Sequence, residues 1–174
     1  VRQKSAQIIE EADRVTAQLN EFINYSRPRE VRRTAVTLGA VVGEVVRALN
    51  CDLEEKNIRL HRTEEPVVIA ADEQLLRQAL FNLLDNAAKY SPDGSTIRIR
   101  SWRDQDAICL QVLDEGDGIP PGDLEHIFDK FYRARKGDQV RAGTGLGLAI
   151  SRGFVEAMHG TITAANRSDR TGAV

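Results

Sequence analysis

The chain has 174 residues, 41% of them hydrophobic and 29% charged, with a formal net charge of −2. It is long enough to bury one good core, and its small net charge argues against nucleic acid or an anionic membrane as a partner. No apolar run reaches membrane-spanning length and no signal peptide precedes Val1, so we expect a cytoplasmic fragment. Any inner-membrane anchor of the full-length protein would lie outside it. Cys51 and Cys109 lack the spacing of a zinc site or a disulfide framework.

A heptad pattern opens the chain. Apolar or small residues recur from Val1 to Ser26 at alternating intervals of four and three, which predicts a helix that packs along another helix. Pro28 disfavours helical geometry in the residue before it, so this helix should end at residue 27. We interpret residues 28–36 as a basic linker.

Amphipathic and alternating patterns predict the elements that follow. Apolar residues at helical spacing over residues 38–53 indicate a helix, with Thr37 as its N-cap and Asn57 as its stop. Short apolar runs predict strands over 58–62 and 67–70. The longest amphipathic stretch predicts a helix over 72–90, with Asp72 as its cap.

The second half of the chain mixes strands and helices after a turn at residues 91–94, where Ser-Pro-Asp-Gly has strong turn chemistry. The expected elements are strands over 96–102, 107–113 and 161–165, a short helix over 123–127 and a helix over 146–158. Helices mixed with strands that lie largely in hairpins predict an α+β fold, with helices on one face of a mixed sheet.

Two asparagines and a lysine share one face of the long helix. Asn82 and Asn86 are four residues apart and Lys89 follows within the next turn, so their side chains point the same way. An amide oxygen is a suitable ligand for magnesium, and a lysine can pair with phosphate. Taken alone, the two asparagines are equally compatible with an ordinary polar surface.

A strand end carries the next candidate group. In "LDEGDGI", Asp114 follows an apolar strand and is able to accept a hydrogen bond from an exocyclic amine. Gly116 and Gly118 would let the loop pass close to a flat ring. The alternative is a tight turn with solubilising acids.

The last two stretches are "FDKFYR" and "RAGTGLGLAISRG". The aromatic residues of the first lie in a polar region, where they either serve a site or pin the loop to the core. In the second, Gly143, Gly145 and Gly147 directly precede a predicted helix, whose first amides are able to bind phosphate oxygens. Such a glycine run by itself is more typical of tight packing.

In this order and spacing, the stretches "QALFNLLDNAAKYSP", "DEGDGI", "FDKFYR" and "GTGLGLAIS" resemble the asparagine, first glycine, phenylalanine and second glycine boxes of sensor histidine kinases. The segment ending "LNEFINYSRPR" is similar to the second helix of that family's dimerisation and phosphoacceptor hairpin. The resemblance implies a two-layer α/β sandwich of the Bergerat type, with ATP between the long helix and a lid. It assigns residues 1–27 to the hairpin, 28–36 to the linker and 37–174 to the catalytic ATP-binding domain, whose last strand would continue past Val174.

The same resemblance implies roles for individual residues. Asn86 would bind magnesium, Asn82 would support the metal and the phosphates, and Lys89 would contact phosphate. Asp114 would hold the adenine amino group. The residues implied around the nucleotide, with two lid anchors among them at Phe128 and Phe131, are Tyr90, Gly116, Gly118, Ile119, Phe128, Phe131, Gly143, Thr144, Gly145, Leu146, Gly147 and Leu148.

The expected activity is transfer of the γ-phosphoryl group of ATP to a histidine of the hairpin, for relay to a response-regulator aspartate. None of His61, His126 and His159 stands in a phosphoacceptor motif, so the acceptor is expected upstream of Val1. We expect the full-length protein to be a homodimer. ATPases of this fold typically carry a glutamate where Asn82 stands, and an amide is unable to accept a proton from water, which favours transfer over hydrolysis.

Two other functions stay open at this stage. A serine kinase that regulates a sigma factor would share the ATP fold but would lack the heptad helix. A nucleotide-sensing module without catalysis would keep the same four boxes. The subfamily is also open, because "GTITAANRSDRTGAV" resembles potassium-responsive sensor kinases and "LNEFINYSRP" resembles nitrogen-type kinases.

Overall fold

The structure is a computed structural model that describes residues 30–133, 135–136, 139–140, 144–169 and 171–174. The heptad segment at residues 1–27 and the first glycine of the glycine run, Gly143, lie outside this part. Within it, no helix is both long and apolar enough to cross a bilayer.

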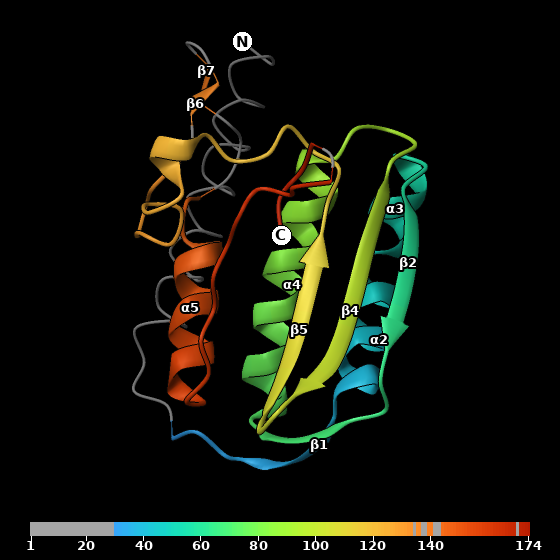
Figure 1. Ribbon diagram of the computed structural model, residues 1–174, viewed down its shortest axis with the longest axis vertical. Helices are drawn as coiled ribbons and strands as arrows, with labels where there is room; N and C mark the ends of the chain where they lie inside the picture. Colours follow the sequence, from blue (N-terminus) through green and yellow to red (C-terminus); the bar gives the residue numbers. More distant parts are fainter. Residues whose placement is uncertain (1–29, 134, 137–138, 141–143, 170) are drawn as a thin grey trace, which may run out of the picture.

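The central elements form two layers, a three-stranded mixed sheet and the helices that cover one of its faces (Figure 1), and the other described strands form two separate two-stranded ladders. They are β1 (Thr34–Thr37), α2 (Leu38–Ala48), α3 (Asn50–Glu55), β2 (Arg59–Glu64), β3 (Val68–Ala71), α4 (Glu73–Tyr90), β4 (Thr96–Asp104), β5 (Ala107–Leu113), the 3₁₀ helix η1 (Pro121–Asp123), β6 (Arg135–Lys136), β7 (Gln139–Val140) and α5 (Gly147–Ala157). In the three-stranded sheet, β2 runs parallel to β4, and β4 runs antiparallel to β5. α4 packs against both α2 and α5 (Figure 1). This arrangement confirms the predicted α+β sandwich with a mixed sheet.

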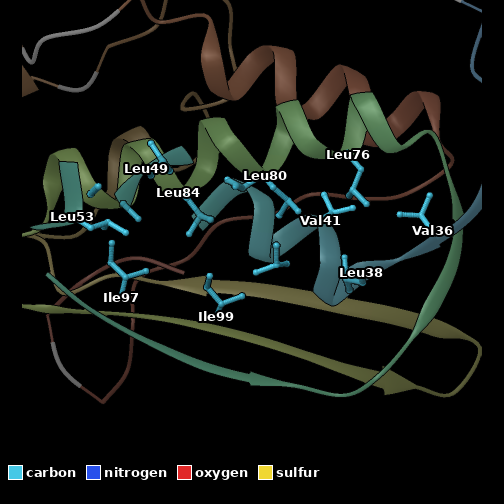
Figure 2. Close-up of a cluster of buried hydrophobic side chains, with 14 of the residues drawn as sticks. Val36, Leu38, Val41, Leu49, Leu53, Leu76, Leu80, Leu84, Ile97 and Ile99 are labelled. Carbon is cyan, nitrogen blue, oxygen red and sulfur yellow. The ribbon is translucent and has the colours of Figure 1, made fainter. Parts of the chain in front are cut away.

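The core lies between the sheet and the helices. Alternate residues of a strand point to the same face, so Ile97 and Ile99 of β4 both point inward and are 0% and 1% exposed. Leu80 and Leu84 are one helical turn apart on α4 and are also buried. Figure 2 shows these side chains with Val41 of α2 in the space between the strands and the helices. The helix face opposite this core is left to form the candidate site.

α4 is held at both ends by polar contacts. The Asp72 side chain accepts hydrogen bonds from two amides of the first turn, at 3.1 and 3.2 Å, as a helix cap does. At the other end, Lys56 Nζ donates to the carbonyl oxygens of Ala88 and Ser91, both at 2.7 Å. A cation there also matches the negative end of the helix dipole. These contacts fix the last turns of α4, where the candidate ligands stand.

The beginning of the domain differs from the sequence prediction. Residues 28–36 were expected to form a linker, but β1 (Thr34–Thr37) pairs antiparallel with β3, with Thr34 opposite Ala71. Val36 is the only hydrophobic residue of this strand that is buried. A four-residue strand with one inward side chain gives little sequence signal, and its pairing partner lies far along the chain. Strand pairing therefore begins inside the expected linker.

Two helix predictions also need correction. The helix expected over residues 38–53 is divided into α2 and α3 at Leu49, where the backbone ψ is 4°. Leu49 and Leu53 are both buried, so the break leaves both side chains in the core. The helix expected over 123–127 is replaced by η1 and irregular turns, because Pro121 and Gly122 shift the helical turn toward the N-terminus.

The strand expected over residues 161–165 does not form. The segment closes instead as a narrow hairpin, in which the backbone N–H groups of Ala165 and Val174 each donate to the other's carbonyl oxygen at 2.9 Å. A single bridge pairs Asn166 with Ala173. The Asp114 N–H donates to the Ala173 carbonyl oxygen at 3.0 Å, which attaches the hairpin to the end of β5. The last residues of the chain, Ala173 and Val174, therefore pair with Asp114 and Ala165, respectively.

Candidate nucleotide-binding site

A cleft of about 1060 Å³ opens between α4, the loop that follows β5 and the start of α5. Its lining brings together most residues that the resemblance placed around a nucleotide: Asn82, Asn86, Lys89, Tyr90, Asp114, Gly116, Gly118, Ile119, Phe128, Thr144, Gly145, Gly147 and Leu148. Leu146 is buried beneath the cleft and Phe131 lies outside it.

Asn82 and Asn86 stand one turn apart on α4 but have different surroundings. Asn82 is buried, and its Nδ2 donates to the Gly147 carbonyl oxygen at 3.0 Å and to Ser151 Oγ at 3.3 Å. Asn86 is half-buried in the lining of the cleft, and no residue in the described part of the chain hydrogen-bonds its carboxamide. Asn82 thus joins α4 to α5, and Asn86 is available to a ligand. A role of Asn82 toward metal or phosphate stays a prediction.

Lys89 has a partner in the structure. Its Nζ lies 2.5 Å from Asp85 Oδ2, and its side chain is 55% exposed. An exposed pair at this helical spacing stabilises a helix by only about 0.3–0.5 kcal/mol. The ammonium group would therefore exchange Asp85 for a phosphate at little cost.

The two oxygens of the Asp114 carboxylate have different surroundings. Oδ1 accepts hydrogen bonds from the backbone N–H groups of Gly116 at 2.8 Å and Ala173 at 3.0 Å. No donor to Oδ2 is found among the described residues, and the side chain lines the cleft. The carboxylate is therefore oriented by backbone amides through one oxygen, and the other is left to accept from a ligand.

The C-terminal hairpin forms one wall of the cleft. Arg167 is buried, with only 1% of its side chain exposed. Its Nη1 donates to the Asp114 carbonyl oxygen at 2.9 Å, and its Nε and Nη2 donate to the Asp169 carboxylate at 2.9 and 2.6 Å. The hydrogen bond with Asp169 raises the pKa of the Arg167 guanidinium above its ordinary value, against the opposing effect of burial. Arg167 thus stays charged beside Asp114.

Asn166 holds the loop that follows Asp114. Its Oδ1 accepts from the Ile119 N–H at 2.7 Å, and its Nδ2 donates to the Ile119 carbonyl oxygen at 2.6 Å. Sequence reasoning missed both Asn166 and Arg167. The sequence predicted a turn over residues 168–172, but a turn pattern does not indicate which part of the protein the turn packs against.

The two phenylalanines of the lid differ from one another. Phe128 is buried, and the guanidinium of Arg152 lies 4.4 Å from its ring centre. Phe131 was expected to anchor the lid, but its side chain is 63% exposed. Its backbone contacts the glycine run, because the Phe131 N–H donates to the Gly145 carbonyl oxygen at 2.9 Å. Phe128 therefore packs with its side chain and Phe131 attaches through its main chain.

Position 145 must be a glycine because of this contact, since the neighbouring backbone leaves no space for a Cβ. Its φ is +71°, and a Cβ there would stand 2.8 Å from the carbonyl carbon of Phe131, closer than real contacts allow. α5 begins two residues later with no side-chain cap and no acidic residue in its first turn. The N–H groups of a helix start have no partner within the helix. The glycine run therefore gives close backbone packing and leaves an uncapped helix start at the cleft.

The polar groups that line the cleft suit a nucleotide with a bound magnesium ion. The second carboxylate oxygen of Asp114 is able to accept a hydrogen bond from an amine, the uncapped start of α5 is suited to an anion, and the carboxamide oxygen of Asn86 is suited to a hard cation. The described residues include no group of three or more His, Cys, Asp or Glu side chains that would hold a metal by themselves. A metal held by one amide would thus depend on the phosphates of the nucleotide.

The sequence of this chain is similar to a protein family and to individual known proteins. Residues 71–174 match the family described as histidine kinase-, DNA gyrase B-, and HSP90-like ATPase. The sensor protein KdpD of Clostridium acetobutylicum is 35% identical over 139 residues, which cover 79% of this chain and 15% of that protein. The sensor protein CreC of Escherichia coli is 39% identical over 138 residues, which cover 79% of this chain and 29% of that protein. The chain thus spans less than a third of either relative.

A solved structure also shares the fold. Histidine kinase ThkA in complex with response regulator protein TrrA has a TM-score of 0.78 and 27% identity, over 95% of this chain and 47% of that chain. The match of the family model covers more than half of the chain, and it includes α4, the loop after β5 and α5. The chain belongs to the histidine kinase-, DNA gyrase B-, and HSP90-like ATPase family and carries the ATP-binding domain of a sensor histidine kinase.

Proposed function

We propose that this chain binds Mg-ATP in the cleft and transfers the γ-phosphoryl group to a histidine of its own protein's dimerisation hairpin. One observation carries the proposal: Asp114 Oδ2 and the Asn86 carboxamide line the same cleft, and neither has a hydrogen-bond partner among the described residues. Both residues are only partly buried, so a ligand that enters the cleft would displace water from these groups and use their free hydrogen-bonding capacity.

The adenine ring would lie against the loop that follows β5. Asp114 Oδ2 would accept the hydrogen bond of the exocyclic amino group, since its other oxygen is already occupied by two backbone amides. Ile119, held in the lining of the cleft, would contact the ring. Gly116 and Gly118 would shape this part of the pocket, since a Cβ on them would stand 2.7 Å from the Tyr90 carbonyl oxygen and 2.8 Å from Asn166 Oδ1.

The triphosphate would extend toward α5. The N–H groups at the uncapped start of this helix would donate to phosphate oxygens, and Lys89 would pair with them in place of Asp85. Asn86 would hold the magnesium ion, whose charge offsets that of the phosphate oxygens during transfer.

Asn82 supports transfer over hydrolysis. Its side chain is a carboxamide, which has no basic oxygen to take a proton from water, and its Nδ2 is engaged with Gly147 and Ser151. A water molecule in the cleft would therefore lack a general base at this position. The phosphoryl group would instead pass to a nucleophile that approaches from outside.

The acceptor is proposed to lie on the hairpin, in a segment N-terminal to the described residues. His61 is on β2, His126 pairs with Asp129 in the turns after η1, and His159 follows α5. Each belongs to the ATP-binding domain itself, and none is on a helix of a dimerisation hairpin. From the hairpin, the phosphoryl group would pass to an aspartate of a response regulator, in line with the response regulator bound to ThkA. We propose that the full-length protein acts as a homodimer.

A transfer assay tests the proposal. The full-length protein is incubated with magnesium and γ-labelled ATP, and the stability of the bound label is measured. Acid-labile, base-stable label on the protein is the expected result, because phosphohistidine has this stability. An Asn86→Ala variant should reduce magnesium-dependent ATP binding by at least about tenfold, a cost typical of damage to a metal site.

The matched control is Asn50→Ala, which removes an exposed asparagine of α3 whose side chain donates to Glu54 Oε1 at 2.7 Å. It should bind and transfer like the unaltered protein. ATP binding without any transfer would instead support a nucleotide-sensing module, and label on a serine would support a serine kinase of the same fold. Full magnesium-dependent binding in Asn86→Ala would show that the metal site is assigned to the wrong residue.

A further inference from the structure

The adenine-facing side of the cleft is built from two segments that are distant in sequence. One is the loop that follows β5, which carries Asp114 and Ile119. The other is the C-terminal hairpin, described over residues 165–169 and 171–174, which contacts both of them. Asp114 interacts with the hairpin through three of its atoms, namely its N–H, its carbonyl oxygen and Oδ1.

From these contacts we infer that Arg167 and Asn166 are positioning residues for recognition of a 6-aminopurine. The inference deepens the proposed function and rests on it. Arg167 fixes the main chain of Asp114, and Asn166 fixes the main chain of Ile119. Neither side chain is proposed to touch the nucleotide. They act by holding Asp114 Oδ2, and the loop that follows Asp114, in the orientation that faces the base.

The role of Arg167 follows from its burial and its three donors. A buried guanidinium must have partners, and here one donor goes to the Asp114 carbonyl oxygen and two go to Asp169. The Asp169 side chain is 52% exposed and needs no buried partner of its own. The carboxylate of Asp169 therefore orients the guanidinium, and the guanidinium holds Asp114.

Gly172 shows how closely the hairpin approaches Asp114. Its φ is +132°, and a Cβ there would stand 2.1 Å from the Asp114 carbonyl oxygen. Any side chain would push the hairpin away from the loop, and Ala173, whose N–H holds Asp114 Oδ1, would move with it. The hairpin is thus in direct contact with the group that reads the base.

The role of Asn166 follows from its geometry. One carboxamide satisfies both the N–H and the carbonyl oxygen of Ile119, at 2.7 and 2.6 Å. These two hydrogen bonds resemble those that a neighbouring strand makes with one residue of a β-sheet. They fix the backbone of the loop at Ile119. Because Asn166 is exposed to solvent, each hydrogen bond contributes less than a buried one would. Its effect should be smaller than that of Arg167.

The test compares two nucleotides that differ at the purine 6-position. Affinities of the chain for Mg-ATP and for Mg-inosine triphosphate, which carries a 6-oxo group in place of the amine, are measured by titration calorimetry. Arg167→Met should lower the preference for ATP over inosine triphosphate by about tenfold, equivalent to losing one well-oriented hydrogen bond to a charged group. Asn166→Ala should lower the preference by about threefold. Arg167→Lys, which keeps the charge and one donor, should lie between Arg167→Met and the unaltered chain.

The ratio of the two affinities separates positioning from general support. A merely structural role would weaken both nucleotides equally and leave the ratio unchanged, and that result would overturn the inference. Arg47→Met, at an exposed arginine of α2, is the matched control and should leave the ratio unchanged. Binding is measured below the unfolding midpoint of each variant, and Asn166→Ala provides a milder second variant should Arg167→Met unfold. An unaltered chain without preference for ATP would contradict the proposed base recognition itself. A normal preference that persists in every variant would contradict only the inference.

Discussion

The carboxylate of Asp114 has one oxygen bound to backbone amides and one directed to the cleft. The family resemblance predicted that this residue faces a ligand, and the structure places its side chain in the lining of the cleft. The sequence contains no sign that Ala173, 59 residues further along, donates to Oδ1. That contact is made by a backbone N–H, which every residue except proline carries. The sequence therefore predicted the carboxylate that lines the cleft, but not the backbone group that orients it.

An Asp114→Asn variant tests this division of tasks. The asparagine oxygen would keep the two backbone hydrogen bonds, so its NH₂ would occupy the position of Oδ2 and would donate where the adenine amine needs an acceptor. The affinity for ATP should fall at least about tenfold, and the affinity for inosine triphosphate should rise relative to it. Binding of both nucleotides is measured by calorimetry. An unchanged ratio would mean that the base does not lie at Asp114.

At the scale of elements, the structure agrees with the sequence where a helix carries its own end signals. α4 was predicted over residues 72–90 and is found over Glu73–Tyr90, because Asp72 caps it and a Ser-Pro-Asp-Gly turn follows. β1 and the C-terminal hairpin were not predicted correctly. Their pairing depends on β3 and on Asp114, which are distant in sequence, and strand formation follows such pairing more than local preference.

The contact between α4 and α5 should affect both the stability of the protein and the rate of amide hydrogen exchange in α5. Asn82 donates from α4 to Gly147 and Ser151 of α5, and it is buried where it does so. Asn82→Ala should reduce the free energy of unfolding by about 1–3 kcal/mol. Amide hydrogen exchange should also become faster in α5, at the start of the helix above all. Asn50→Ala, at an exposed asparagine, should change neither. Unaltered exchange in α5 would show that apolar packing alone holds the two helices together.

At the scale of the whole molecule, the two layers were predictable because hydrophobic periodicity differs between helices and strands. The inward residues Ile97 and Ile99 of β4 are two apart, and Leu80 and Leu84 of α4 are four apart. The cleft was predicted from four motifs, but its volume and its C-terminal wall were not. These depend on how far the loops extend over the layers, which no local pattern encodes.

Two valines with different exposure test the packing of the core through the free energy of unfolding. Val42 of α2 is 0% exposed and Val68 of β3 is 59% exposed. Val42→Ala should lower the free energy of unfolding by about 2–3 kcal/mol, since it removes buried methyl groups and leaves a cavity. Val68→Ala should cost less than about 1 kcal/mol. Urea unfolding monitored by circular dichroism measures both. Equal losses would mean that the layers are not packed as Figure 2 shows.

The place of the C-terminal hairpin has a consequence for biosynthesis. During translation, residues 34–113 leave the ribosome before residues 165–174, and they contain both faces of the helix and sheet core. The core therefore becomes available for folding while the wall beside Asp114 is still missing. A nucleotide stabilises only the states that bind it, so it is unable to assist this first step. Nucleotide affinity in a nascent chain would thus report that synthesis has passed Ala173, where the last backbone donor to Asp114 stands.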